Sequence, residues 1–153
     1  MITDRIIISD ILTPARTLCS VHGVSKKKIL EVIAGLISEE LPSINAKHLL
    51  TALISRERLG ATGIGGGVAL PRCRSKACIA PTGLFLRLTE PVDFESMDQK
   101  PVDLIFALIV PEGNSEKHME ILKILANRFK SEDLLNKMRE ADNRAELYHC
   151  ITS

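Results

Sequence analysis

Residues 56–76 read R-E-R-L-G-A-T-G-I-G-G-G-V-A-L-P-R-C-R-S-K, with four glycines in the run Gly63, Gly65, Gly66 and Gly67. Its glycines fall between a helix-like apolar segment and the short apolar run 68–70, which Pro71 ends. Glycine reaches positive φ and lets a backbone approach a ligand or another strand closely. Two interpretations are therefore open: a loop that holds phosphate, or a tight helix-to-strand connection that needs small residues. The spacing matches neither a Walker loop nor the dinucleotide fingerprint.

The phosphate-loop interpretation has definite candidate ligands. Thr62, Gly63 and Gly65 would bind an anion through the threonine hydroxyl and free backbone N–H groups. Five basic residues lie in the same stretch, namely Arg56, Arg58, Arg72, Arg74 and Lys76. For Arg56 a structural role is the alternative, because it falls in the last turn of a predicted helix, where a cation interacts favourably with the helix dipole.

Composition narrows the class of protein. The chain has 153 residues, which suits a single domain over 1–153, and a net charge of +1 gives no overall attraction to nucleic acid or membrane. It has no Trp and one Tyr, which argues against a base-stacking surface. We find no signal peptide and no stretch long enough to cross a membrane, so we expect a cytoplasmic protein. The four cysteines are scattered without zinc-ligand spacing, so we expect reduced thiols, no metal site and no cofactor.

Hydrophobic periodicity and capping residues predict a mixed α/β order. A lead-in spans 4–13, with a helical turn at 9–12 that Pro14 limits. Helices are predicted at 25–40, from Ser43 or Asn45 to 59, from Asn114 or Ser115 to about 129, at 132–139 and at 143–151. Strands are predicted at 17–24, 68–70, 83–88 and 102–110, with an edge or turn segment at 91–94. The run 102–110, V-D-L-I-F-A-L-I-V, is apolar enough for a central strand covered on both faces. The expected fold class is therefore α/β, a mixed β-sheet sandwiched by α-helices.

His118 lies in the first turn of the predicted helix that begins near Ser115, on its inward face. A helix N-terminus offers free N–H groups and positive partial charge, which makes it an anion site. A neutral imidazole there can hydrogen-bond a phosphoryl oxygen. The alternative is a packed histidine with one satisfied nitrogen. Ser115 and His118 are thus further candidates for binding an anion.

The stretch S-R-E-R-L-G-A-T-G-I-G-G-G-V-A-L-P-R-C-R resembles the active-site region of nitrogen-regulatory enzyme IIA proteins, of the fructose/mannitol type of phosphotransferase-system IIA domains. Further segments agree with the family in order and spacing, namely 25–33, 93–111, 116–122 and 145–148, so that the resemblance covers nearly the whole chain. It implies a cytoplasmic phosphocarrier that receives a phosphoryl group from a histidine-phosphorylated carrier protein of the nitrogen branch. It also implies regulation of partners such as potassium-transport proteins and sensor kinases, without nucleic acid or membrane insertion.

In the resembled family the acceptor histidine directly follows the proline of the A-L-P segment, and here that position is Arg72. Arg56 and His118 match the family's supporting arginine and second histidine. A guanidinium has no free lone pair and stays protonated, whereas an imidazole can attack phosphorus and later release the group. Two roles stay open for Arg72, namely binding an anion and facing an acidic partner. We predict that it accepts no phosphoryl group and that its charge favours a state like the unphosphorylated one.

Two hypotheses follow for the function. In the first, the chain is a phosphoryl-relay and regulatory protein whose acceptor has been replaced. In the second, it is a degenerate, non-catalytic module that regulates partners by contact alone. A third interpretation, a nucleotide-binding regulator that uses the glycine loop, rests on the glycines only.

Overall fold

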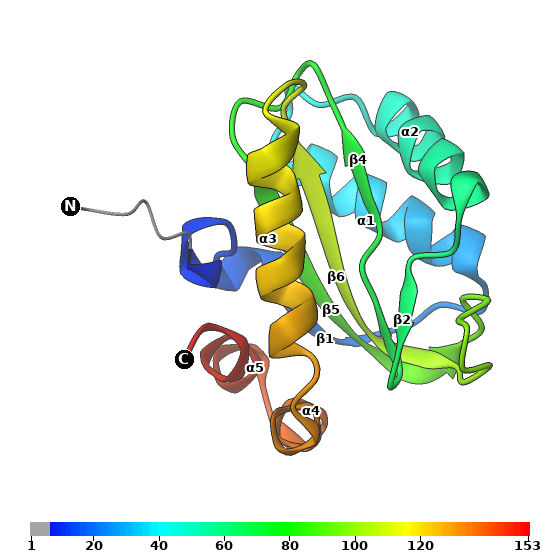
Figure 1. The fold of residues 1–153 in the computed structure, drawn as a ribbon, viewed down its shortest axis with the longest axis vertical. Helices are drawn as coiled ribbons and strands as arrows, with labels where there is room; N and C mark the ends of the chain where they lie inside the picture. Colours follow the sequence, from blue (N-terminus) through cyan, green and yellow to red (C-terminus); the bar gives the residue numbers. More distant parts are fainter. Residues whose placement is uncertain (1–6) are drawn as a thin grey trace.

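The structure is a computed structural model that describes residues 7–153 (Figure 1). Within this range, six strands form one mixed sheet in the order β1-β5-β6-β3-β2, and β4 also pairs with β6. The strands are β1 Thr17–Val21, β2 Gly63–Gly65, β3 Val68–Ala69, β4 Arg72–Arg74, β5 Thr82–Val92 and β6 Val102–Val110. β5 and β6 are antiparallel, whereas β1 runs parallel to β5, and β3 and β4 run parallel to β6.

The described helices comprise two short 3₁₀ turns, Ile8–Asp10 and Pro14–Arg16, and the α-helices α1 Lys26–Glu40, α2 Ala46–Leu59, α3 Ser115–Arg128, α4 Glu132–Glu140 and α5 Arg144–Thr152. Each α-helix begins after a residue whose side-chain oxygen accepts a hydrogen bond from a backbone N–H of the first turn. These caps are Ser25, Asn45, Asn114, Ser131 and Asn143. Such caps satisfy backbone donors that the helix itself leaves unpaired.

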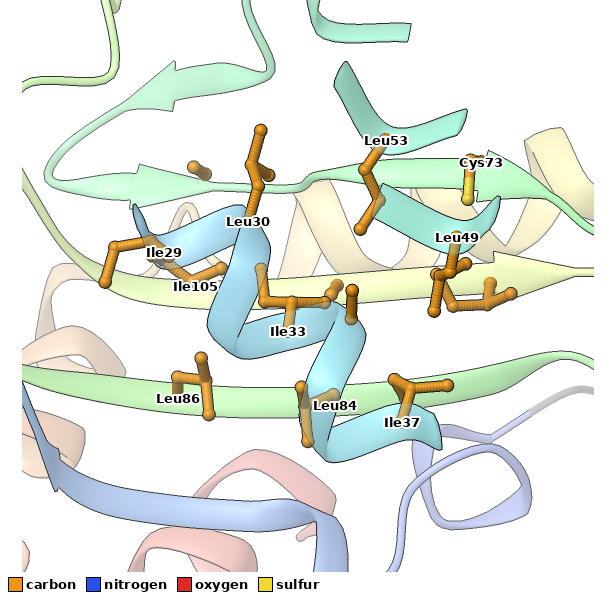
Figure 2. Close-up of a cluster of buried hydrophobic side chains, with 14 of the residues drawn as sticks. Ile29, Leu30, Ile33, Ile37, Leu49, Leu53, Cys73, Leu84, Leu86 and Ile105 are labelled. Carbon is orange, nitrogen blue, oxygen red and sulfur yellow. The ribbon is translucent and has the colours of Figure 1, made fainter. Parts of the chain in front are cut away.

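The sheet lies between two layers of helices, with α1 and α2 on one face and α3 and α5 on the other (Figure 1). Figure 2 shows the first of the two cores, in which side chains of α1 and α2 point onto β5 and β6. Ile33 and Phe106 illustrate the two cores, since both are fully buried and belong to different clusters. The expected sandwich of a mixed sheet and helices is confirmed, and β6 is its central strand.

β3 and β4 together form one interrupted strand along the edge of β6. Val68 and Ala69 pair with Leu104 and Ile105, and Arg72–Arg74 pairs with residues 108–110. Proline lacks an N–H to donate, so the ladder breaks at Pro71, although its carbonyl still accepts a bond from Leu108 N at 2.9 Å. This pairing carries the chain past Pro71 and delivers Arg72–Arg74 to the carboxyl end of the sheet.

The predicted helices agree with the structure to within a residue or two, and Asn45 and Asn114 prove to be the caps of α2 and α3. Several strand predictions are wrong in extent. β1 ends at Val21 rather than at 24, and β5 continues to Val92 rather than ending at 88. The short strands β2 and β4 were not predicted. Residues 4–6 of the predicted lead-in lie outside the described residues, and the helical turn of the lead-in occupies Ile8–Asp10.

Candidate anion-binding cavity

A cavity of about 630 Å³ lies over the edge strand β4, between α2 and α3. Arg56 enters it from the last turn of α2, Arg72 and Arg74 enter from β4, and His118 enters from the first turn of α3. Apolar and small residues complete the lining: Ala52, Ser55, Leu59, Cys73, Leu108, Val110, Ser115, Met119 and Leu122. Residues that are 62 positions apart in the sequence thus meet at one site.

The sheet topology explains this convergence. β4 and β6 run parallel, so their carboxyl ends meet at the same edge, and β6 leads directly into the turn before α3. Crevices outside the carboxyl ends of strands are the usual ligand sites of open α/β sheets. Arg74 Nη2 donates to Ser115 Oγ at 3.0 Å and so ties β4 to the start of α3.

The cavity has an excess of positive charge. Among residues 7–153, no Asp or Glu lines it, and no ion pair involves Arg56, Arg72 or Arg74. Arg56 Nη1 donates to the Gly60 carbonyl at 2.9 Å, and Arg72 Nη1 donates to the Leu70 carbonyl at 3.2 Å. Each guanidinium carries five N–H donors, so most donors of all three arginines stay free for a ligand.

His118 is the most buried polar side chain of the cavity, with 8% of its surface exposed. Its Nδ1 atom is buried and has no hydrogen-bond partner in the described part of the chain. Burial, and then the positive charges of Arg74 and Lys117, lower the pKa of the imidazole. The ring is therefore biased toward its neutral form, which offers one donor and one acceptor.

Burial is the main cause that lowers the pKa of Arg72, followed by the charge of Arg56, while the charge of Glu57 acts in the opposite direction. Arginine starts from a pKa so high that it remains a cation in proteins. Two neighbouring cations repel each other, and an anion between them offsets this repulsion by attracting both. The cavity thus favours an anion beside Arg56 and Arg72.

The glycine loop lies elsewhere. Of the four residues predicted to bind phosphate, only Ser115 lines this cavity, whereas Thr62, Gly63 and Gly65 do not. Thr62 is buried, and its N–H and its hydroxyl both donate to the Glu57 carboxylate, at 2.9 and 2.5 Å. A side chain at Gly63 would overlap that of Ser96. Both positions are thus accounted for by packing.

Gly66 and Gly67 form the turn between β2 and β3, and both have positive φ, as does Gly65 at the end of β2. The N–H of Gly66 donates to the Asp98 carboxylate at 3.0 Å, and the carbonyl of Gly66 accepts from Arg139 at 2.7 Å. A carboxylate thus occupies the donor that a phosphate would need. Together with α3 and α4, this turn lines a second cavity of about 790 Å³.

Besides Arg56, Arg72, Ser115 and His118, the first cavity is lined by nine residues that the predicted site left out, Arg74, Leu59 and Met119 among them. The alternation Arg72-Cys73-Arg74 is a signal for the missed strand, since only the middle residue is buried. Within 7–153, no three His, Cys, Asp or Glu side chains are grouped as metal ligands. Nor does any described helix have the length and apolarity to cross a membrane.

The fold and the cavity define an α/β protein with a cationic pocket at the carboxyl edge of its sheet. The family model for the phosphoenolpyruvate-dependent sugar phosphotransferase system, EIIA 2, matches residues 10–153. A nitrogen regulatory protein of Pseudomonas aeruginosa is 42% identical over 144 residues, which cover 94% of this chain and 94% of that protein. A nitrogen regulatory protein of Escherichia coli K12 is 35% identical over 95% of this chain and 89% of its own length.

Two solved structures of IIA proteins have the same fold as this chain. The crystal structure of nitrogen regulatory protein IIA-Ntr from Neisseria meningitidis matches with a TM-score of 0.90 at 34% identity, over 95% of this chain and 99% of that chain. The mannitol IIA protein of Escherichia coli, at 15% identity and a TM-score of 0.76, shows a likeness of fold alone, over 92% of this chain and 98% of that chain. The chain therefore belongs to the EIIA 2 family of the phosphotransferase system, and the resemblance to its nitrogen-regulatory members is confirmed.

Proposed function

We propose that this chain is a regulatory IIA protein of the nitrogen branch. It receives a phosphorylated carrier protein in the cavity over β4, between α2 and α3, which we call the β4 cavity, but takes no phosphoryl group at residue 72. The observation that carries the proposal is that Arg72 lines the same cavity as Arg56 and His118. This supports the role that the resemblance implies for position 72, because Arg56 and His118 are suited to binding a phosphoryl oxygen. The support for the carrier protein as a partner is the family to which this chain belongs.

The chemistry of residue 72 decides what happens after docking. Transfer breaks the P–N bond of the carrier's phosphohistidine and forms a new P–N bond to an acceptor nitrogen with a free lone pair. Arg72 has no such nitrogen, because the guanidinium lone pairs are delocalised and its nitrogens stay protonated. It would bind the phosphoryl oxygens and leave the group on the carrier. His118 we assign to assisting, as the family resemblance implies.

A fixed positive charge at residue 72 also sets the regulatory state. A phosphohistidine would bring negative charge into the cavity, whereas Arg72 adds positive charge to that of Arg56 and Arg74. The chain would then act on its targets as a permanently unphosphorylated protein. We propose potassium-transport proteins and sensor kinases as the classes of target.

A second candidate function is a module that acts on partners by contact alone and no longer engages the carrier. Its support is the exposed apolar rim of the cavity, where Leu59 and Met119 are 85% and 55% exposed. Such residues favour a protein contact that needs no phosphoryl chemistry.

A competition experiment distinguishes the two functions. The Arg72→His variant is incubated with enzyme I of the nitrogen branch, the carrier protein and labelled phosphoenolpyruvate, with and without an excess of the unmodified chain. If the unmodified chain docks without accepting, it slows labelling of the variant in proportion to its concentration. Unchanged labelling of the variant would contradict carrier docking and favour the contact module.

A further inference from the structure

The β4 cavity holds more unpaired positive charge than a structural role requires. Several other basic side chains of the described region are neutralised: Arg16 pairs with Glu40, Lys26 with Glu57, and Arg139 with Asp103. Arg56, Arg72 and Arg74 line one cavity without an acid among its lining residues. An anion among these side chains would offset their mutual repulsion.

His118 is an independent indication of a ligand. Its side chain is more than nine-tenths buried, and its buried Nδ1 atom lacks a partner within the described residues. A buried polar atom that stays unpaired costs free energy, so such atoms normally have partners. The first turn of α3, which Asn114 caps, adds positive partial charge beside the histidine.

The remaining walls are apolar. Apolar side chains of three elements line the cavity: Leu108 and Val110 of β6, Ala52 of α2, and Met119 and Leu122 of α3. The cavity measures about 630 Å³, which is within the range of pockets for organic ligands. A single phosphate ion would fill only a small part of it and would leave the apolar wall in water. The cavity therefore offers an anionic corner and an apolar chamber side by side.

We propose that the β4 cavity binds a small phosphate monoester with an apolar body, which remains bound without reacting. The phosphate would lie among Arg56, Arg72 and His118, and the organic part would lie against Leu108, Met119 and Leu122. This inference rests on the proposed function in one respect, namely that residue 72 does not consume the phosphoryl group. A histidine acceptor makes the site a relay, whereas Arg72 makes it a receptor that a free ligand can occupy in place of the carrier.

The test uses three probes on the unmodified chain: 1-naphthyl phosphate, inorganic phosphate and 1-naphthol. Calorimetric titration gives the three dissociation constants, and the imidazole resonances of His118 report the place of binding. We expect 1-naphthyl phosphate to bind at least about tenfold tighter than inorganic phosphate, because the ring buries apolar surface. The neutral naphthol should bind more weakly than the ester, because it lacks the charge-assisted bonds.

Matched variants separate the two halves of the site. Arg72→Gln should weaken binding of the ester at least about tenfold. Arg58→Gln removes the same charge from an exposed position of α2 and should change the affinity for the ester less than about twofold. Met119→Gln should weaken binding of the ester and leave the affinity for inorganic phosphate unchanged. Equal affinity for ester and phosphate, equal effects of the two arginine variants, absence of binding, or unshifted His118 resonances would each overturn the inference. Labelling of the Arg72→His variant is measured separately, so that failure of ligand binding is not confused with failure of the proposed function.

Discussion

The Glu57 carboxylate fastens the start of the glycine loop, since it accepts the backbone N–H of Thr62 at 2.9 Å and the Thr62 hydroxyl at 2.5 Å. It also pairs with Lys26 Nζ at 2.7 Å. Glu57 is buried, so this one side chain joins the end of α2 to the start of α1 and to the approach of β2. Its neighbour Arg56 faces the cavity, so the network fixes the wall from which Arg56 projects.

Replacement of Glu57 by glutamine should destabilise the fold strongly. The change leaves Lys26 with only the exposed Glu95, at 3.2 Å, as an acidic partner and exchanges a carboxylate acceptor for an amide, at a cost of roughly 2 kcal/mol in the free energy of unfolding. Glu31→Gln is the matched control, because Glu31 pairs with Lys28 at 3.4 Å on the surface of α1 and should contribute less than about 0.5 kcal/mol. Urea denaturation of both variants measures the difference, and equal losses would contradict the role given to Glu57.

Gly67 tests whether backbone geometry alone explains the glycine loop. Its φ is +81°, and a Cβ there would lie 2.5 Å from Arg139 Nη2 and 3.0 Å from Asp103 Oδ1. Gly67→Ala should therefore cost at least about 1–2 kcal/mol through the left-handed backbone alone. At Gly60 nothing lies within 4 Å of the place that a Cβ would take, so Gly60→Ala should be nearly neutral. The two midpoints of thermal unfolding give the comparison; a neutral Gly67→Ala would mean that the turn does not need glycine.

His118 should make the fold sensitive to acid. Burial, Arg74 and Lys117 lower its pKa in the folded state, while the unfolded chain titrates near 6.5. Between the two values the unfolded state binds more protons, so stability is lost as the pH falls below about 6.5.

The measurement compares the free energy of unfolding at pH 7.5 and at pH 5 for the unmodified chain and for His118→Gln. The variant should lose less stability on acidification, because glutamine does not titrate. Replacement of the exposed His48 by glutamine is the control for a histidine that does not line the cavity. Identical slopes for the unmodified chain and His118→Gln would show that His118 does not titrate with a lowered pKa.

The helices and the central strand could be predicted from sequence because their signals are local. Asn45 and Asn114 precede helical stripes, and the run of β6 is apolar enough to mark a strand covered on both faces. β4 could not be predicted in this way, because three residues after a proline form a strand only through pairing with residues 108–110 of β6. Its one local signal is the buried Cys73 between two arginines.

The candidate site, too, could be predicted from the sequence only in part. The spacing of Arg56, Arg72 and His118 says nothing about their distance in space, and their convergence depends on the parallel pairing of β4 with β6. Resemblance to a family grouped them, whereas the phosphate-loop interpretation of the glycine run had assigned Thr62, Gly63 and Gly65 to the phosphate. Those residues owe their types to the Glu57 network and to a tight turn, which are tertiary features.

The most direct test of the central claim is phosphoryl transfer from labelled phosphoenolpyruvate, through enzyme I and the carrier protein, to the unmodified chain and to its Arg72→His and Arg72→Gln variants. Acid-labile label should appear on the Arg72→His variant, at position 72 by mass spectrometry, and should be absent from the other two proteins. Label on the unmodified chain, at His118 or elsewhere, or an unlabelled Arg72→His variant, would contradict the account.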